Sequence, residues 1–356
     1  MPRIQHLAFR PFDVELSEPF GIATGAQHVA KNLLVEVGLE GGVLGIGEAA
    51  PFPAVNGETR EDAERVLTHG RERLLGLEAL TWRAASRKAH DVLAEAPSAL
   101  CAFETALLDA LTRSLGISLF AFFGGAKPEL ISDVTLTTGN AEQAAAQAAS
   151  AYQRGFRVLK VKVGGVPLTH DLERLQRAAA VAPDAALVLD ANASLRPEEA
   201  IRLVRALGAL RERVVLFEQP TPPDDVHALR AVREAGIKVA ADESARSLAD
   251  VEQLIDEQAA DVINVKIMKT GVVTALDMAL GARAAGIELM IGGMVETRLA
   301  MTTSACLAGG LGGFSFVDLD TPLFLANDPF QGGFEDAWPR LKLSAITLGH
   351  GVHGGA

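Results

Sequence analysis

The sequence predicts a TIM-like α/β barrel covered by a smaller α+β domain. From residue 133 onward, short apolar segments alternate with Ala- and Leu-rich amphipathic segments, which is the pattern of parallel βαβ units. The apolar segments end, at intervals of 24 to 28 residues, on Thr137, Lys162, Asp190, Glu218, Asp242, Lys266, Gly292 and Asp318. Eight such strands fit a barrel. The alternative is a doubly wound open sheet, but it usually has fewer strands and a glycine fingerprint that TLTTGN (135–140) lacks.

The residues before these repeats predict a separate domain. HLAFRPFDVEL (6–16) and KNLLVEVGLEGGVLGIGEAAP (31–51) alternate like strands, and Gly41-Gly42 predicts a hairpin turn. Helical patterns follow from about Glu58 and end in SALCAFETALLDALTRSLG (98–116). A Gly- and Pro-rich stretch at 122–133 predicts the domain boundary. We therefore expect a capping domain at 1–125, a barrel at 126–325 and a C-terminal segment at 326–356.

Composition narrows the class of protein. The 356 residues carry 33 basic and 45 acidic side chains, a net charge of -12, which argues against nucleic acid or an anionic membrane as the main partner. The sequence shows no apolar run of about 20 residues, and its start lacks the apolar stretch of a signal peptide, so we expect a cytoplasmic protein. Cys101 and Cys306 are expected to be buried free thiols.

Acidic residues at three neighbouring strand ends predict a metal site. In a barrel, residues at the carboxyl ends of the strands face the active site. Any one acid there could instead cap the following helix, but capping does not readily explain why seven of the eight strand ends carry polar side chains at equivalent positions. Oxygen ligands from Asp190, Glu218 and Asp242 suit a hard cation such as Mg²⁺, and the absence of histidine at these ends argues against zinc. Alternation alone leaves the choice between Asp242 and Glu243 open.

Lysines at two other strand ends predict acid–base chemistry. Lys160 and Lys162 lie on one face of the second strand, and Lys266 ends the sixth, half a turn away in a ring of eight. The amine groups of these lysines would therefore approach a bound substrate from opposite faces. Burial, a nearby cation and the second lysine should lower the pKa of Lys162 toward that of a general base. Structural salt bridges with the acids are the alternative. They would explain why lysines accompany the acids, but not why the lysines lie on opposite sides of the ring.

This layout predicts inversion at a carbon centre. Mg²⁺ bound to a substrate carboxylate acidifies the α-proton, because the metal stabilises the enediolate that forms. One lysine removes this proton, and the opposite lysine returns one to the other face. The expected reaction is racemisation or epimerisation.

Six motifs resemble those of the enolase superfamily and, within it, the muconate-lactonising group. They are KVKVGG (160–165), LDANAS (189–194), FEQP (217–220), ADES (241–244), NVKIMKTG (264–271) and MIGGMVET (290–297). FETALLDAL (103–111) and GEAAP (47–51) resemble its capping domain, so the resemblance covers nearly the whole chain. It implies a (β/α)7β barrel whose C-terminal segment returns to the cap. It further implies Lys162 as base, Lys160 as its accessory, Lys266 as opposing acid/base, and one Mg²⁺ held by Asp190, Glu218 and Asp242 rather than Glu243.

An acidic pair narrows the substrate class. FSFVDLDTP (314–322) places Asp318 and Asp320 on one strand face, where two carboxylates away from the metal suit an ammonium group, although a helix-capping pair is the alternative. The pair resembles that of dipeptide epimerases, in which it holds the amino terminus of the peptide. The resemblance implies epimerisation of the C-terminal residue of an L,L-dipeptide. We also predict substrate contacts at Thr135, Gly293 and Glu296; Glu296 could line the pocket, attract a cationic side chain or be structural.

Two cap segments are predicted to form loops that close over the barrel and select the side chains of the substrate. They are EPFGIATGAQHVAK (18–31) and PFPAVNGET (51–59), and the residues expected to face the substrate are Phe20, Ile22, Thr24 and Val55. The early part of the first segment has no arginine, although His28 and Lys31 lie further along. Because the Ala-Glu epimerases that the chain resembles use an arginine there, an apolar or other dipeptide is favoured over an acidic one.

Two other functions remain open. A cycloisomerase or an o-succinylbenzoate synthase-like lyase of the same superfamily would share the metal ligands and lysines, but the acidic pair would repel a dicarboxylate. A non-catalytic, metal-dependent binding protein would not need opposed lysines. The expected partner is a small dipeptide, and assembly into a homo-oligomer is left open.

Overall fold

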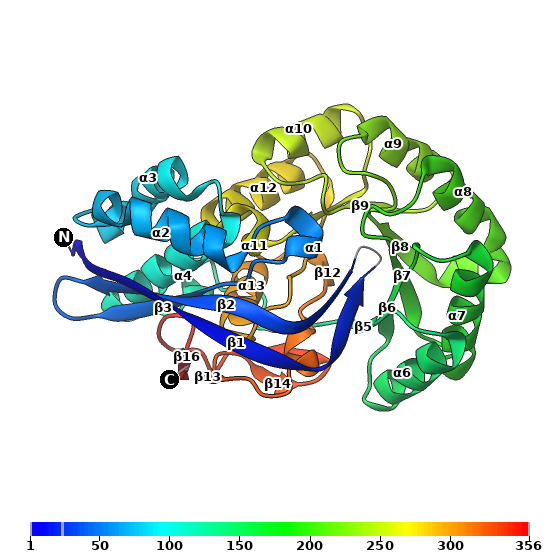
Figure 1. The fold of residues 1–356 in the computed structure, drawn as a ribbon, viewed down its shortest axis with the longest axis horizontal. Helices are drawn as coiled ribbons and strands as arrows, with labels where there is room; N and C mark the ends of the chain where they lie inside the picture. Colours follow the sequence, from blue (N-terminus) through cyan, green and yellow to red (C-terminus); the bar gives the residue numbers. More distant parts are fainter. Residues whose placement is uncertain (1, 23–24, 355–356) are drawn as a thin grey trace.

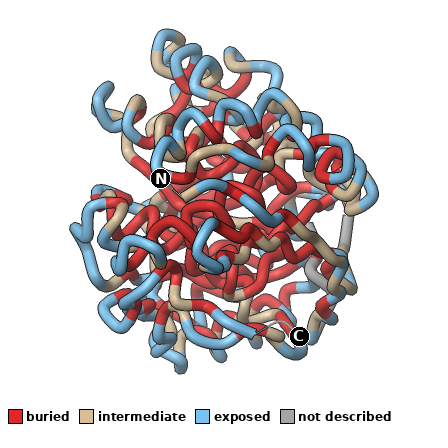
Figure 2. Tube along the Cα trace, turned by 90° about the vertical axis from the view of Figure 1, so that its left-hand side faces the viewer, coloured by how far each residue is buried: buried red, intermediate tan, exposed pale blue. Residues whose placement is uncertain are grey.

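The computed structural model describes residues 2–22 and 25–354, which form an N-terminal sheet and helices packed beside an eight-stranded parallel barrel (Figure 1). Buried residues concentrate in the centre of the molecule, and exposed residues follow the outer helices (Figure 2). The predicted fold class, a barrel with an α+β capping domain, is confirmed. None of the described helices is long and apolar enough to cross a membrane.

The N-terminal sheet is antiparallel in the order β1-β2-β3. Its strands are β1 (Ile4–Ile22), β2 (Gly25–Leu39) and β3 (Leu44–Ala49), and the predicted turn at Gly41-Gly42 joins the last two with positive φ angles. Strand β3 lies directly on a long helix, because a Cβ at Gly47 would overlap the carbonyl oxygen of Ala102. The helices of this region are α1 (Pro53–Asn56), α2 (Arg60–Leu74), η1 (Ala79–Thr81), α3 (Trp82–Leu93), α4 (Pro97–Ser114) and α5 (Leu119–Phe122).

The first predicted cap loop is largely strand, which corrects one expectation. Residues 18–22 belong to β1 and residues 25–31 to β2, with Ile22 paired to Gly25. The Gly- and Pro-containing sequence suggested a loop, but antiparallel pairing, with one irregularity between Glu15 and Phe20, carries the ladder as far as Ile22 and Gly25. The hairpin end rests on the barrel, since a Cβ at Gly21 would overlap the Thr138 hydroxyl.

The barrel follows the predicted βα alternation. Its strands are β5 (Val134–Leu136), β6 (Val158–Lys162), β7 (Ala186–Asp190), β8 (Val214–Glu218), β9 (Val239–Ala241), β10 (Val262–Val265), β11 (Glu288–Ile291) and β12 (Phe314–Val317), neighbours in that order. Between them lie α6 (Ala141–Gln153), α7 (Leu168–Val181), α8 (Pro197–Ala206), η2 (Gly208–Arg213), α9 (Val226–Glu234), α10 (Leu248–Asp256), α11 (Ile267–Thr270), α12 (Val272–Ala284) and α13 (Arg298–Leu311). The arrangement is the expected (β/α)7β.

Strand register aligns the polar ends at one mouth of the barrel. Lys162 pairs with Asp190, and Asp190 pairs with Glu218. Beneath them, alternate residues of the same phase fill the barrel interior as a separate apolar cluster made of Val188, Leu216, Ala240, Val262 and Met290. The ring closes where the Asp133 amide donates to the Val317 carbonyl at 2.8 Å, joining the start of β5 to the end of β12. The polar side chains at the carboxyl ends of the strands, beyond this apolar cluster, therefore point toward the same mouth of the barrel.

The C-terminal segment returns to the N-terminal region, as the resemblance implied. After η3 (Thr321–Phe324), the chain forms β13 (Phe330–Gly332), β14 (Glu335–Ala337), β15 (Arg340–Lys342) and β16 (Val352–Gly354), with β15 also pairing β4 (Glu129–Ile131). The buried His350 amide donates to Asp109 Oδ1 of α4 at 3.0 Å, and its Nε2 lies 3.0 Å from the Ile46 carbonyl of β3. Figure 1 shows the C-terminus beside the N-terminal sheet.

Two buried carboxylates join the cap to helices of the barrel. Glu48 of β3 accepts hydrogen bonds from the amide and hydroxyl of Thr297 and from the Ala300 amide at the start of α13. Glu104 of α4 accepts from the Val273 amide at the start of α12 at 2.9 Å. Each acid satisfies amides that a helix start leaves free. Burial raises the pKa of Glu48 and of Glu104 to about 7, although these hydrogen bonds lower it.

The Glu48 carboxyl should make stability depend on pH. Its pKa rises from 4.5 to about 7 on folding. The folded state therefore holds the proton more tightly, and this contribution to stability is complete below about pH 4.5 and is lost as pH rises through 7, by roughly 3 kcal/mol at most. We expect Glu48→Gln to flatten the decline of the free energy of unfolding between pH 5 and 8, measured by urea denaturation, and the exposed control Glu72→Gln to leave it unchanged. An unaltered slope in Glu48→Gln would contradict this.

Candidate active site

A small cavity of about 30 Å³ lies at the barrel mouth beside the cap. Phe52 and Val55 border it from the cap side, and Asn192, Met294 and Thr321 border it from the barrel loops. The remaining lining residues are all predicted site residues: Thr135, Lys160, Lys162, Lys266, Gly293, Asp318 and Asp320. Its volume is about the share of one water molecule in the liquid, so the cavity is too small for a substrate in this conformation.

The three predicted metal ligands lie side by side below this cavity. Asp190 and Glu218 end β7 and β8, Asp242 follows β9, and all three are at most 1% exposed. Lys160 Nζ lies 2.9 Å from Asp190 Oδ2 and 2.7 Å from Glu218 Oε2. Lys266 Nζ lies 2.6 Å from Asp242 Oδ2. The acids thus face one space, with lysine ammonium groups between them.

This donor set fits a hard divalent cation. It consists only of carboxylate oxygens from adjacent strands, which is the chemistry that Mg²⁺ prefers. Glu218 Oε2 is buried and receives no hydrogen bond from any described residue, being held only by its ion pair with Lys160. Glu243, the alternative to Asp242, instead accepts a hydrogen bond from Asn192 Nδ2 at 3.3 Å and lines a separate, larger cavity. The geometry thus favours Asp242.

Neighbouring charges give the three acids different pKa values. Burial alone would raise the pKa of Asp190, but the charges of Lys160, Lys162 and Lys266 outweigh it and hold this pKa below its usual range. Lys266 and Lys269 likewise lower the pKa of Asp242 against the effect of burial. Burial and the neighbouring charge of Asp190 raise the pKa of Glu218 to about 7. Glu218 is therefore the acid whose negative charge is least compensated by the protein.

The predicted acid–base lysines stand on opposite walls. Lys162 on β6 donates to Asp190 Oδ2 at 2.6 Å and to Asn192 Oδ1 at 3.0 Å. Lys266 follows β10, and three strands, β7 to β9, separate the two on one side of the ring. Burial lowers the pKa of Lys160, but Asp190, Asp318 and Glu218 surround it and raise the pKa well above its usual value. Lys160 is therefore held as an ammonium ion.

The acidic pair lines the cavity, and Asp318 shares the Lys160 ammonium group with Asp190 and Glu218. Lys160 Nζ donates to Asp318 Oδ2 at 2.7 Å, and the Thr135 amide donates to Asp320 Oδ2 at 2.5 Å. A third acid, Asp133, lies beside them, with one oxygen of each carboxyl group within 4.8 Å of the others. Sequence reasoning placed Asp133 at the start of a strand and missed this contact.

Further buried side chains that the sequence reasoning missed hold the site in place. Lys269 Nζ donates to Asp242 Oδ1 and to the Asp242 carbonyl, both at 2.6 Å. Asn264 Nδ2 donates to Glu218 Oε1 at 2.8 Å, and Arg174 of α7 donates to the Lys162 carbonyl at 2.6 Å. A signal existed for Lys269, which lies about one helical turn after Lys266 in an otherwise apolar stretch. The sequence gives no such signal for Arg174, because it lies in the amphipathic helix α7 among other charged residues.

The predicted specificity residues divide into three groups. Val55 lines the cavity, whereas Glu296 is buried, accepts the Met294 amide at 2.7 Å and, among the described residues, lines neither cavity. Phe20 and Ile22 lie on β1. Their side chains, and the whole of Thr24, lie outside the part of the chain that the structure describes.

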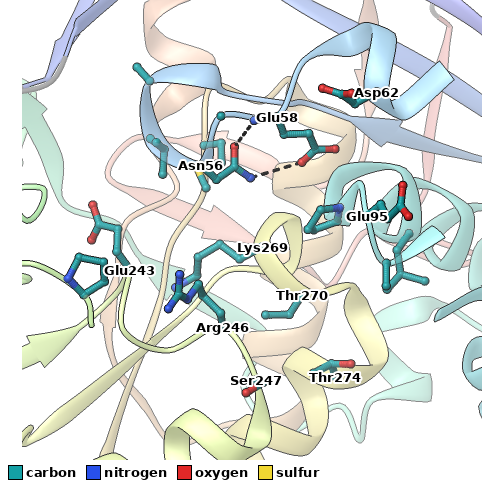
Figure 3. A pocket seen from close by; sticks show the side chains of 18 of the residues that line it. Asn56, Glu58, Asp62, Glu95, Glu243, Arg246, Ser247, Lys269, Thr270 and Thr274 are labelled. Carbon is teal, nitrogen blue, oxygen red and sulfur yellow. Dashed lines mark hydrogen bonds between the residues drawn. The ribbon is translucent and has the colours of Figure 1, made fainter. Parts of the chain in front are cut away.

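A second cavity of about 730 Å³ adjoins the first between cap and barrel. Val55, Asn192 and Met294 line both cavities. Figure 3 shows Asn56 and Glu58 reaching it from the cap and Lys269 from the barrel. The larger space therefore adjoins the small cavity at these three shared residues.

Comparison with known proteins identifies relatives over the full length. "Aromatic dipeptide epimerase" of Herpetosiphon aurantiacus is 46% identical over 351 residues, 98% of each chain. "L-Ala-D/L-Glu epimerase" of Thermotoga maritima is 35% identical, covering 96% of this chain and 99% of that one. A crystal structure of dipeptide epimerase from Enterococcus faecalis, complexed with Mg and the dipeptide L-Leu-L-Tyr, superposes with a TM-score of 0.94 at 31% identity, covering 98% of this chain and 99% of that one.

Family models match both parts of the chain. Residues 7–124 match the N-terminal domain of mandelate racemase / muconate lactonizing enzyme, and residues 143–353 match the enolase C-terminal domain-like family. The resemblance predicted from the motifs is confirmed, and the chain belongs to the mandelate racemase/muconate lactonizing enzyme family of the enolase superfamily.

Proposed function

We propose that this protein is a Mg²⁺-dependent dipeptide epimerase that inverts the α-carbon of the C-terminal residue of an L,L-dipeptide. The observation that carries the proposal is one cavity with three kinds of group at it. Lys162 and Lys266 stand on opposite walls, three carboxylates that fit a cation pair with the buried lysines, and Asp318 and Asp320 line the cavity. A dipeptide has the matching ends, a carboxylate and an ammonium group.

The charges around the cavity orient the substrate. Asp190, Glu218 and Asp242 would hold Mg²⁺, and Asp318 and Asp320 would accept hydrogen bonds from the amino terminus. When bound, Mg²⁺ would stabilise the negative charge that develops on the substrate carboxylate. The α-carbon of the C-terminal residue then lies between the two lysine walls.

Two lysines perform the proton transfers. A neutral amine on one wall removes the α-proton, and the ammonium group on the other wall donates a proton to the opposite face of the carbon. Their opposition lets the configuration invert without rotation of the substrate. Lys160, surrounded by three carboxylates, stays positively charged and serves as an electrostatic accessory to Lys162.

The relatives support the substrate class. Proteins named as epimerases of aromatic and of Ala-Glu dipeptides match this chain over nearly its whole length, and a related structure contains Mg and a dipeptide. A substrate side chain that lay next to Phe52, Val55 and Met294 would have apolar neighbours, and the early part of the 18–31 segment has no arginine. We therefore propose apolar dipeptides ahead of acidic ones.

The alternatives fit the geometry less well. A cycloisomerase or a synthase acting on a dicarboxylate would place a second negative charge near Asp318 and Asp320, which are buried at 6% and 1% exposure. A binding protein without catalysis would gain nothing from lysines on opposite walls. Both are outcomes of the test below.

A dipeptide library tests the proposal. The protein is incubated with L,L-dipeptides and Mg²⁺ in D₂O, and mass spectrometry detects deuterium at the α-carbon. We expect deuterium at the α-carbon of the C-terminal residue, most rapidly when its side chain is apolar, and no deuterium at the α-carbon of the N-terminal residue. If no dipeptide exchanges while a muconate or succinylbenzoate precursor turns over, the protein is a cycloisomerase or lyase; if nothing exchanges, it is not an enzyme of this type.

A further inference from the structure

The seam where the barrel closes carries a buried acid that the proposed reaction has not used. Asp133 directly precedes β5, and its amide donates to the Val317 carbonyl at the end of β12. Asp318 is the next residue along, so the seam places the side chains of Asp133 and Asp318 together. Asp133 is 4% exposed, and its Oδ1 receives no hydrogen bond from any described residue.

Each member of the acidic pair has its own partners. Asp320 accepts from the Thr135 amide, and Asp318 accepts from Lys160 Nζ. Asp318 also shares a hydrogen bond with the Asp133 carboxyl. Asp133 itself does not line the cavity in the described structure, so it acts on a ligand only through Asp318.

Three carboxyl groups this close in a buried place cannot all be ionised. Burial and the charges of Asp318 and Asp320 raise the pKa of Asp133 well above its usual value. Lys160 lowers the pKa of Asp318 against the effect of burial. Burial and the charge of Asp318 also raise the pKa of Asp320, to about 7. In the contact between Asp133 and Asp318 the proton therefore resides on Asp133, which donates it, and Asp318 remains a carboxylate.

We infer that Asp133 is a positioning residue of the ammonium-binding site, a neutral carboxylic acid whose O–H donates to Asp318 and aims that carboxylate at the amino terminus of the substrate. A hydrogen bond between Asp133 and Asp318 fixes one side of Asp318, and Lys160 fixes the other. This inference rests on the proposed function, because it specifies how the same site recognises a primary ammonium group.

Two substitutions separate hydrogen-bond donation from charge. Asp133→Ala removes the donor and should raise KM for an alanyl dipeptide about tenfold, the cost of losing one hydrogen bond to a charged group, with kcat within about twofold. Asp133→Asn keeps a donor of the same shape and should leave KM within about threefold of wild type. If the alanine variant does not fold, Asp133→Asn is sufficient to test the inference. A tenfold rise in KM of the asparagine variant would show that a neutral donor at this position does not serve the proposed role.

A desamino ligand shows whether the effect concerns the ammonium group. The N-propanoyl derivative of the same C-terminal amino acid lacks only that group, and its inhibition constant should be equal in wild type and Asp133→Ala. The control Ser132→Ala perturbs the same seam, where Ser132 Oγ accepts the Leu319 amide at 3.0 Å, and should leave KM unchanged. An unchanged KM in Asp133→Ala, a parallel rise of the inhibition constant, or an equal rise in Ser132→Ala would overturn the inference. Failure of wild type to turn over any dipeptide would overturn the proposed function instead.

Discussion

Lys266→Ala is expected to abolish epimerisation of any dipeptide that the wild-type protein turns over, with a loss in kcat of at least about a thousandfold, and Lys162→Ala is expected to do the same. The reason is geometric: each lysine is the only group proposed to handle the proton on its wall, and β6 and β10 hold them on opposite sides of the ring. Chiral chromatography of the two diastereomers measures the loss.

The two lysine variants should also differ from one another. Lys266→Ala leaves Lys162 in place, so it should still exchange the α-proton of one diastereomer with D₂O, and Lys162→Ala should exchange only the other. The exposed Lys88, which pairs with Asp91 on α3, provides the control variant Lys88→Ala. Full epimerisation by either site variant would refute the two-base mechanism.

Asp242→Asn should raise the Mg²⁺ concentration needed for half-maximal activity by at least about a hundredfold, and chelation of divalent cations should abolish turnover of the wild-type protein until Mg²⁺ is restored. Glu218→Gln, which is nearly isosteric, should act in the same direction. Titration of activity with Mg²⁺ measures both effects.

The neighbouring acid supplies a matched control for the metal site. Glu243 follows Asp242 directly, yet it accepts a hydrogen bond from Asn192 and lines the larger cavity. Glu243→Gln should therefore leave the Mg²⁺ requirement within about threefold of wild type. Equal effects of Asp242→Asn and Glu243→Gln would mean that the choice of ligand is wrong.

Much of the barrel could be predicted because its strands are buried on both faces and its helices on one. Such strands are mostly apolar, so a polar residue at the end of the run marks where the strand meets solvent or a site. Lys162, Asp190 and Glu218 indeed end β6, β7 and β8. Parallel pairing then brings residues at equivalent strand ends together without any further information.

The contacts that escaped prediction depend on distant parts of the chain. Asp133 and Asp318 meet only because the first and last strands of the ring are neighbours, which local pattern does not reveal. Lys269 reaches Asp242 because α11 is a single turn that folds back over the mouth. Residues 18–22 and 25–31 are strand because pairing between β1 and β2 outweighs their Gly- and Pro-containing sequence.

The deuterium content of the first product formed in D₂O tests the central claim, that two lysines on opposite walls invert one α-carbon. The wild-type protein is given a pure L,L-dipeptide in D₂O with Mg²⁺, and the first L,D product is analysed by mass spectrometry before substrate is depleted. The account predicts that nearly every product molecule carries deuterium at the α-carbon, because the proton arrives from the lysine opposite the one that removed it. Product that retains the original proton in a measurable fraction would show that one base serves both faces, and would contradict the account.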